Sequence, residues 1–324
     1  MATAVLRPFP TPPGRPAPPA PPTPPTGDRQ LSVASAVLEL PGGRRLGYAW
    51  HGPRDGRPVV YLHGAVGTPL RPDPAMLETL AREHVRLLLP SRPGFGRSDR
   101  APGRRIHDWP GDLLALADAL RLERFSLIGV SAGGPYALAC ARQLPAERLR
   151  RTLVSGCVAP VLGPGAAAPG SLVLRGGRAA LRRPLLARRV GDRLATALHR
   201  HPRLLGASLA WRASAADRRL LDAGERAQIV QATLEATEHG IGPFLDDLDL
   251  VLRPWGFEPE SVSGEVLLVH GGQDATVPPA HARELARRLP RGSLRLLAGE
   301  GHFFFRARLG ELLTLLLAPP PGGR

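Results

Sequence analysis

Short apolar segments alternate with amphipathic ones along much of the chain, and this alternation constrains the fold more than any other feature. Segments such as VRLLLP at 85–90 are apolar throughout, which is typical of strands buried on both faces of a parallel sheet. Helical patterns of about ten residues separate them. The expected strands lie at 32–40, 44–50, 57–64, 85–90, 124–130 and 149–156, and the expected helices at 76–84, 108–121 and 132–144. This order predicts an α/β fold with a mostly parallel, doubly wound sheet.

The alternation stops after Pro160 and resumes near residue 263. Residues 160–262 carry helical patterning without a convincing strand. Strands are then expected again at 264–272 and 293–299, with helices at 279–290 and 305–317. We therefore expect a helical insertion at 160–262 that divides one core domain into a first part at 31–159 and a second part at 263–324.

The first 30 residues have a different composition. They are mostly Pro, Ala, Thr and Gly, and they lack the apolar stretch of a secretory signal. We expect an extended, disordered tail. Several PxxP spacings leave open a second interpretation, recognition by a proline-binding domain.

The formal net charge of +15 would ordinarily suggest an anionic partner. All 43 basic residues are arginine, however, and Ala, Gly and Pro are also abundant, which favours GC-rich codon usage over selection for phosphate contact. Aromatic residues do not alternate with the charges as stacking on bases requires. We expect no nucleic-acid partner, and no stable membrane insertion because no apolar run approaches the roughly 18 residues needed to cross a bilayer.

The chain has two cysteines, Cys140 and Cys157. Cys140 falls in an expected helix and Cys157 just after an expected strand, where small buried thiols are common. Two such residues make no disulfide framework, so we interpret both as packing residues and expect a reducing, cytoplasmic location.

The sequence GVSAGG at 129–134 places Ser131 between an expected strand and an expected helix. Gly129 and Gly133 flank the serine, as the tight backbone contacts of a nucleophile elbow require. The N–H groups of the helix that begins near Ala132 favour negative charge developing beside the serine. Serine is a poor nucleophile by itself, so a base and an acid that orients the base must be found elsewhere.

Both partners follow later strands. Asp274 lies in HGGQDATVP after one expected strand, and His302 lies in GEGHF after the last one. Because the carboxyl ends of parallel strands share one edge of a sheet, Ser131, Asp274 and His302 should converge there. Two alternatives stay open: His302 as a helix-capping histidine, and an acid drawn from FLDDLDLVLRPW, where the spacing suits a helix with one acidic face. The aspartates of that segment are Asp246, Asp247 and Asp249.

Together, VVYLHGAVG, SRPGFGRSD, GVSAGG, HGGQDATVP and GEGHF resemble the motifs of the α/β-hydrolase superfamily, over residues 35–317. The resemblance implies that Ser131 is the nucleophile, His302 the general base and then acid, and Asp274 the residue that orients the imidazole. It also implies that the backbone N–H groups of Ala65 and Ala132 form the oxyanion hole. His63 and Gly64 would shape this loop, with the His63 imidazole in a structural hydrogen bond, and Asp99 would anchor another loop.

The resemblance further implies a cofactor-independent serine hydrolase, without a metal, whose helical insertion caps the active site. Serine at the elbow, in place of aspartate, argues against alkyl-enzyme chemistry, so we expect a small, apolar carboxylic ester as substrate. A thioesterase, a lactonase, a carbon–carbon bond hydrolase or a binding module without turnover remain as alternatives. The arginines among the leucines of the insertion favour a solvated helix face over a patch for an acidic substrate or a membrane surface. No oligomeric state follows from the sequence.

Overall fold

The computed structural model describes residues 34–65, 72–163 and 166–319. The Pro-rich tail predicted for residues 1–30 lies outside the described residues. The predicted start of the core at residue 31 also precedes them.

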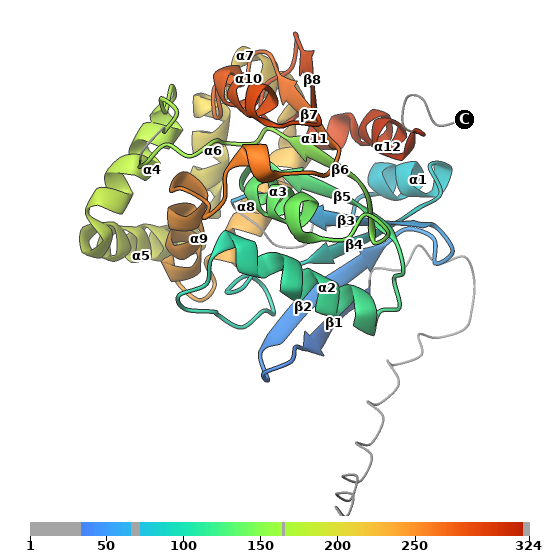
Figure 1. Ribbon diagram of the computed structural model, residues 1–324. Coiled ribbons are helices and arrows are strands. Elements are labelled where there is room, and N and C mark those ends of the chain that lie inside the picture. Colours follow the sequence, from blue (N-terminus) through green and yellow to red (C-terminus); the bar gives the residue numbers. More distant parts are fainter. Residues whose placement is uncertain (1–33, 66–71, 164–165, 320–324) are drawn as a thin grey trace, which may run out of the picture. The chain divides into compact units, whose positions relative to one another are not determined.

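The described residues form an eight-stranded sheet in the order β1-β2-β4-β3-β5-β6-β7-β8 (Figure 1). β2 pairs antiparallel with β1 and with β4, and every other neighbouring pair is parallel. The predicted fold class, a mostly parallel sheet wound with helices, is therefore confirmed. The strands are β1 (Ala34–Glu39), β2 (Arg45–His51), β3 (Arg57–Leu62), β4 (Val85–Pro90), β5 (Phe125–Val130), β6 (Leu149–Ser155), β7 (Val266–Gly271) and β8 (Gly292–Leu297).

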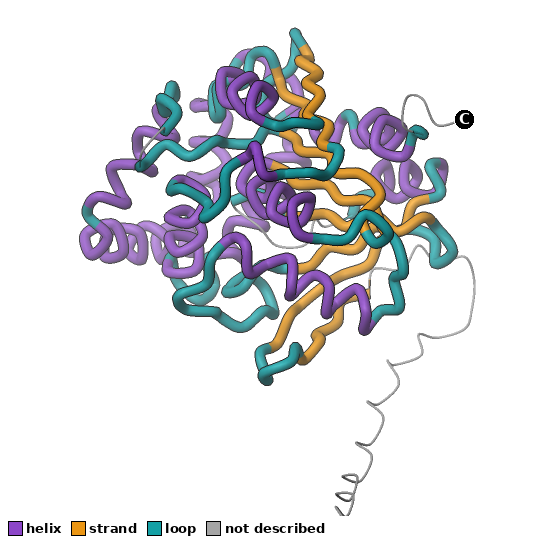
Figure 2. Tube along the Cα trace, in the orientation of Figure 1, coloured by secondary structure: helices purple, strands orange, loops and turns teal. Residues whose placement is uncertain are grey.

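Helices cover both faces of this sheet, and alternate side chains of each strand explain why (Figure 2). In β3, Val60 and Leu62 join one buried cluster with residues of α2, α3 and α10. Val59 and Tyr61, which point the other way, join a second cluster with residues of α1, α11 and α12. The helices are α1 (Pro74–Arg82), α2 (Trp109–Ala119), α3 (Gly134–Gln143), α10 (Pro279–Arg288), α11 (Phe304–Ala307) and α12 (Leu309–Leu317).

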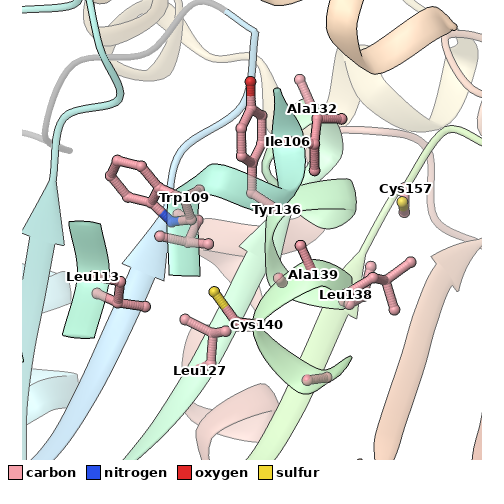
Figure 3. Packing of buried hydrophobic residues seen from close by; sticks show 14 of the residues in the cluster. Ile106, Trp109, Leu113, Leu127, Ala132, Tyr136, Leu138, Ala139, Cys140 and Cys157 are labelled. Atoms are coloured by element: carbon pink, nitrogen blue, oxygen red, sulfur yellow. The ribbon is translucent and has the colours of Figure 1, made fainter. Parts of the chain in front are cut away.

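The α3 helix, which follows β5, lies deep in the first cluster (Figure 3). Cys140 in α3 and Cys157 after β6 are both free and buried there. Burial raises the pKa of both thiols, because an apolar site disfavours the thiolate. They pack as small apolar side chains, as expected.

The described residues between β6 and β7 form six α-helices and no strand. None of the helices in the described ranges is long and apolar enough to cross a bilayer. Figure 1 shows this group to one side of the sheet. Its interpretation as a cap stays a prediction. The helices are α4 (Leu172–Arg182), α5 (Pro184–Arg200), α6 (Pro202–Arg212), α7 (Ala215–Leu220), α8 (Ala223–Ala236) and α9 (Gly242–Leu252).

Candidate active site

Ser131 occupies a sharp turn between β5 and α3. Its φ is +52°, in the left-handed region that L-residues with a side chain rarely adopt. The turn is also crowded: a Cβ on Gly133 would lie 2.3 Å from the carbonyl oxygen of Leu62, and one on Gly129 would lie 2.6 Å from the Cβ of Ala137. Both glycines singled out in the sequence are therefore required by close packing against β3 and α3.

The structure brings Ser131, His302 and Asp274 together. Nε2 of His302 lies 3.2 Å from Oγ of Ser131, and Nδ1 lies 2.7 Å from Oδ2 of Asp274. A carboxylate only accepts hydrogen bonds, so Nδ1–H donates to Asp274 and Nε2 is left to accept from the serine hydroxyl. This tautomer suits removal of a proton from Ser131.

Asp274 is buried, and its two oxygens have separate partners. Oδ1 accepts the backbone N–H groups of Thr276 and Val277, both at 2.8 Å, which fixes the turn after β7. Oδ2 faces His302, with His270 Nε2 at 3.4 Å. Burial opposes the charge on Asp274, but His302 and the hydrogen bonds outweigh it and hold the carboxyl pKa well below its usual range. Asp274 is thus ionised at neutral pH.

The same pair determines the charge preference of His302. Burial disfavours the imidazolium, but the Asp274 carboxylate favours it more strongly by charge and by hydrogen bond, with a smaller contribution from Asp217. The pKa of His302 therefore lies above its ordinary value. The site stabilises the protonated imidazole that proton transfer from Ser131 would create.

The loop after β3 passes beside the serine. A Cβ on Gly64 would lie 3.5 Å from the Cβ of Ser131. The imidazole of His63 is buried in hydrogen bonds: Nε2 accepts from the Arg92 backbone N–H at 3.1 Å, and Nδ1 lies 2.9 Å from the Gly64 carbonyl oxygen. Burial and the charge of Arg92 lower the His63 pKa to about 3, so the ring stays neutral. The oxyanion roles of Ala65 and Ala132 stay predictions.

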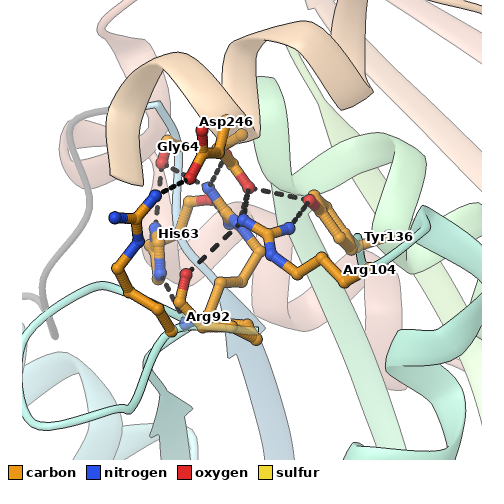
Figure 4. A network of polar contacts seen from close by, with 9 residues as sticks. His63, Gly64, Arg92, Arg104, Tyr136 and Asp246 are labelled. Carbon is orange, nitrogen blue, oxygen red and sulfur yellow. Dashed lines mark hydrogen bonds and ion pairs between the residues drawn. The ribbon is translucent and has the colours of Figure 1, made fainter. Parts of the chain in front are cut away.

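A buried ionic network lies behind this loop (Figure 4). Arg92 is completely buried, and its guanidinium donates to the carbonyl oxygens of His63 and Gly64. It also pairs with Asp247 of α9 at 2.9 Å. Asp247 further accepts from Arg104 at 3.1 Å and from the hydroxyl of Tyr136 at 2.7 Å. The network ties α9 to the predicted oxyanion loop.

The expectation of a single acidic face at 246–249 was wrong. Asp247 is buried in the network, whereas Asp246 pairs with Arg100 and Asp249 pairs with Arg253 at 2.5 Å. Different arginines therefore hold the three aspartates in different directions. In the described part of the chain, the ion pairs of these three aspartates are with arginines, and the carboxylate paired with His302 is that of Asp274.

Sequence reasoning missed Asp217, a buried residue of α7. Its Oδ1 accepts the backbone N–H groups of His302 at 2.5 Å and of Phe303 at 2.9 Å, and its Oδ2 accepts from the Ser214 hydroxyl at 2.8 Å. Only glycine fits at Gly301, where a Cβ would lie 2.2 Å from Oδ1. The one signal in the sequence was Ser-x-x-Asp at 214–217, which by itself indicates a helix start.

No group of three or more His, Cys, Asp or Glu side chains within the described ranges is placed to hold a metal ion. The candidate site is built from Ser131, His302 and Asp274, with the loop after β3 beside them.

Comparison with known proteins places this geometry in a wider context. A family model for the α/β hydrolase fold matches residues 57–306. The crystal structure of bromoperoxidase from Bacillus anthracis superposes with a TM-score of 0.65 at 22% sequence identity, over 88% of this chain and 99% of that one. At this identity the likeness concerns the fold.

Curated relatives match shorter segments of the chain. The chain is 36% identical over 107 residues to 2-hydroxy-6-oxo-2,4-heptadienoate hydrolase from Pseudomonas putida, and the match covers 32% of this chain and 38% of that protein. It is 37% identical over 122 residues to non-heme chloroperoxidase from Streptomyces lividans, with 37% and 44% covered. The matched segments thus span less than half the length of either relative.

Proposed function

The chain belongs to the α/β-hydrolase fold family, and from this membership and the geometry around Ser131 we propose that it is a serine hydrolase that cleaves a carboxylic ester. The observation that carries the proposal is the unbroken hydrogen-bonded chain from Ser131 through His302 to Asp274, at 3.2 and 2.7 Å. A nucleophile, a base and an orienting acid in this geometry are what acyl transfer requires.

The first half of the proposed reaction forms an acyl-enzyme. Oγ of Ser131 attacks the ester carbonyl carbon while Nε2 of His302 takes the hydroxyl proton. The backbone N–H groups of Ala65 and Ala132 stabilise the resulting oxyanion. When the tetrahedral intermediate collapses, His302 returns its proton to the leaving alcohol and the acyl group stays on Ser131.

The second half repeats these steps with water. His302 removes a proton from a water molecule, which attacks the acyl carbon, and the carboxylic acid leaves as Ser131 regains its proton. Asp274 stays ionised throughout and stabilises the imidazolium in both halves. Its low pKa and the raised pKa of His302 support this division of roles.

The test combines a fluorophosphonate probe with a panel of esters of varied acyl length, to which thioesters and lactones are added. We expect the probe to label Ser131, and Ser131→Ala to lose both labelling and hydrolysis while it remains folded. Ser293→Ala, at an exposed position of β8, is the matched control and should keep both. Labelling of another serine in Ser131→Ala would contradict the assignment. An unlabelled, inactive wild-type protein would indicate a binding module without turnover.

A second candidate reaction is hydrolysis of a carbon–carbon bond, and a named relative favours it. The chain is 36% identical over 107 residues to 2-hydroxy-6-oxo-2,4-heptadienoate hydrolase. The same three side chains would serve a water-dependent cleavage next to a ketone. Incubation with 2-hydroxy-6-oxo-2,4-heptadienoate distinguishes the candidates, since turnover of this compound with all esters left intact would replace the ester proposal.

A further inference from the structure

Exposed aliphatic side chains gather on one part of the molecule. The large apolar residues that stand exposed in the described part of the chain all belong to α4, α5 and α6. Three of them, Leu186, Val190 and Leu194, recur at intervals of four residues in α5 and are 53%, 52% and 57% exposed. Residues four apart lie on the same side of a helix, so they form a continuous apolar stripe. The others are Leu172, Val173, Leu185 and Leu204.

The opposite side of α5 is the one that packs. Ala195 is buried, and a Cβ on Gly191 would lie 2.9 Å from the side chain of Ile241. Asp192, although exposed, is also on the side of α5 that contacts the segment before α9, because its Oδ1 accepts the backbone N–H of Ile241 at 2.9 Å. The helix is therefore held on the molecule by one side and presents its apolar stripe outward.

Arginines are dense along α4, α5 and the start of α6. Residues 172–206 contain nine arginines, two histidines and a single acidic residue, Asp192. None of the nine is paired with a carboxylate among the residues that the structure describes. Arg178 even has a buried Nε without a hydrogen-bond partner there. So many positive charges without nearby carboxylates attract a negatively charged partner.

The two kinds of side chain meet in a groove of about 870 Å³ between α4 and α5. Leu186 and Val190 line it together with Arg175, Arg178 and Arg182. We call the outward side of α4 and α5, from Leu172 to Leu194, the α4–α5 face. An apolar stripe edged by arginines is the pattern of a helix that lies in a lipid headgroup layer, with aliphatic side chains in the acyl boundary and cations at the phosphates.

We propose that the α4–α5 face binds the surface of an anionic lipid bilayer. A second copy of the chain does not suit this face, because each copy would bring the same excess of arginine. The exposed apolar side chains are Leu and Val, whereas the cores of protein interfaces are enriched in aromatic residues and Met. Nucleic acid would leave the aliphatic stripe in water. The inference goes beyond the proposed hydrolase function and does not depend on it.

The test measures sedimentation of the full chain with two kinds of vesicle: phosphatidylcholine alone, and phosphatidylcholine with one quarter phosphatidylglycerol. Two triple variants separate the contributions: Arg182→Gln with Arg189→Gln and Arg193→Gln, and Leu186→Gln with Val190→Gln and Leu194→Gln. The matched control, called the core variant, carries three Arg→Gln changes on the surface of the domain that contains the sheet. The replaced residues are exposed and have no carboxylate partner among the described residues: Arg121, Arg124 and Arg283. Circular dichroism verifies that each variant is folded.

We expect the wild type to bind only the anionic vesicles. The α4–α5 arginine variant should bind on the order of a hundredfold more weakly, since each of its three arginines near the surface contributes roughly a fivefold step. The apolar variant should lose about tenfold or more, and the core variant should bind nearly as the wild type does.

Three results would overturn the proposal. If the core variant lost as much binding as the arginine variant, net charge rather than this face would govern adsorption. Undiminished binding of the apolar variant would show that the protein is held to the vesicle by charge alone, without insertion of the aliphatic side chains into the bilayer. Wild-type protein that stays in solution with both kinds of vesicle would exclude the bilayer and point to an acidic protein partner.

Discussion

Arg92 and Arg189 come from the same arginine-rich chain, yet they occupy opposite environments. Arg92 is completely buried, pairs with Asp247 and holds two carbonyl oxygens of the loop beside Ser131. Arg189, in α5, is exposed beside an apolar stripe and has no carboxylate partner among the described residues. The net charge of +15 is therefore not one property of the molecule. Near the candidate active site, the arginine Arg92 is buried and its charge is paired with a carboxylate. On the α4–α5 face, the arginine Arg189 is exposed, so its charge can interact with a partner.

The largest expected effect comes from removing a buried charge at the candidate active site. Asp274→Asn should reduce ester turnover by roughly 10⁴, because the neutral side chain no longer fixes the tautomer or stabilises the imidazolium. The pKa of His302 should fall toward its ordinary value, so residual activity should extend to lower pH. Turnover is measured against pH, with fold verified by circular dichroism.

Asp246→Asn, Asp247→Asn and Asp249→Asn are the controls for this prediction. Near-normal turnover in Asp274→Asn, with a loss of several orders of magnitude in one of these three, would mean that the acid lies in α9. The hydrogen bond from His302 to Asp274 would then have another role.

The next effect concerns stability. Asp247→Ala leaves Arg92 and Arg104 buried without their carboxylate, and should lower the free energy of unfolding by about 3–5 kcal/mol. Asp246→Ala breaks an exposed pair with Arg100 and should cost about 1 kcal/mol or less. Urea unfolding of the two variants compares them. Equal losses would mean that burial does not distinguish the two ion pairs.

The same network predicts a pH dependence. Burial opposes the charge of Asp247, but Arg92 and Arg104 outweigh it and lower the pKa to about 2. A carboxyl whose pKa is lowered by folding stabilises the protein above its unfolded pKa, near 4, and loses that contribution as pH falls toward 2. The free energy of unfolding of the wild type should therefore fall more steeply with decreasing pH between about pH 4 and pH 2 than at higher pH. Asp247→Asn should lack this steepening.

Local patterns predicted the sheet and its edge well. The apolar run at 85–90 coincides with β4, and the glycine turns after β5, β7 and β8 bring Ser131, Asp274 and His302 together. Each of these signals depends on a few neighbouring residues, and the shared edge of parallel strands supplies the rest.

Partnerships across the insertion were not predictable from local patterns. Asp217 bonds to the backbone of His302 across 85 positions, and Asp247 meets Arg92 across 155. Nothing near either aspartate in the sequence specifies its partner, because the contact depends on how α7 and α9 pack. Equally, composition predicted a solvated arginine face, but it could not tell neutralised arginines from unpaired ones.

A smaller effect tests whether the insertion influences the candidate active site. Asp217→Asn keeps an oxygen that can accept the N–H groups of His302 and Phe303 but removes the negative charge. The pKa of His302 should fall, because Asp217 contributes to raising it, so the acid limb of the pH–rate profile should move to lower pH. The rate on the plateau should drop by about tenfold or less, since one positioning contact changes.

Asp217→Ala, which removes the oxygens as well, should reduce turnover further. Asp222→Asn, at the exposed start of α8, is the matched control and should leave the profile in place. An acid limb that stays in place in Asp217→Asn, with only a lower melting temperature, would limit Asp217 to a structural role.

The smallest predicted effect is a gain in stability rather than a loss. Arg189→Glu places an acid four residues before Arg193 in α5, which replaces a repulsive pair by an attractive one in the favourable order. The free energy of unfolding should rise by about 0.5 kcal/mol at low salt, and the gain should vanish at high salt.

Arg45→Glu is the counterpart on the core, where Arg45 donates to Asp99 from its backbone and its guanidinium. There the same change sets two carboxylates against each other, so the melting temperature should fall. Thermal unfolding at two salt concentrations measures both variants. Stabilisation at both positions would mean that net charge alone governs the response, whereas opposite signs would show that pairing distinguishes the two regions.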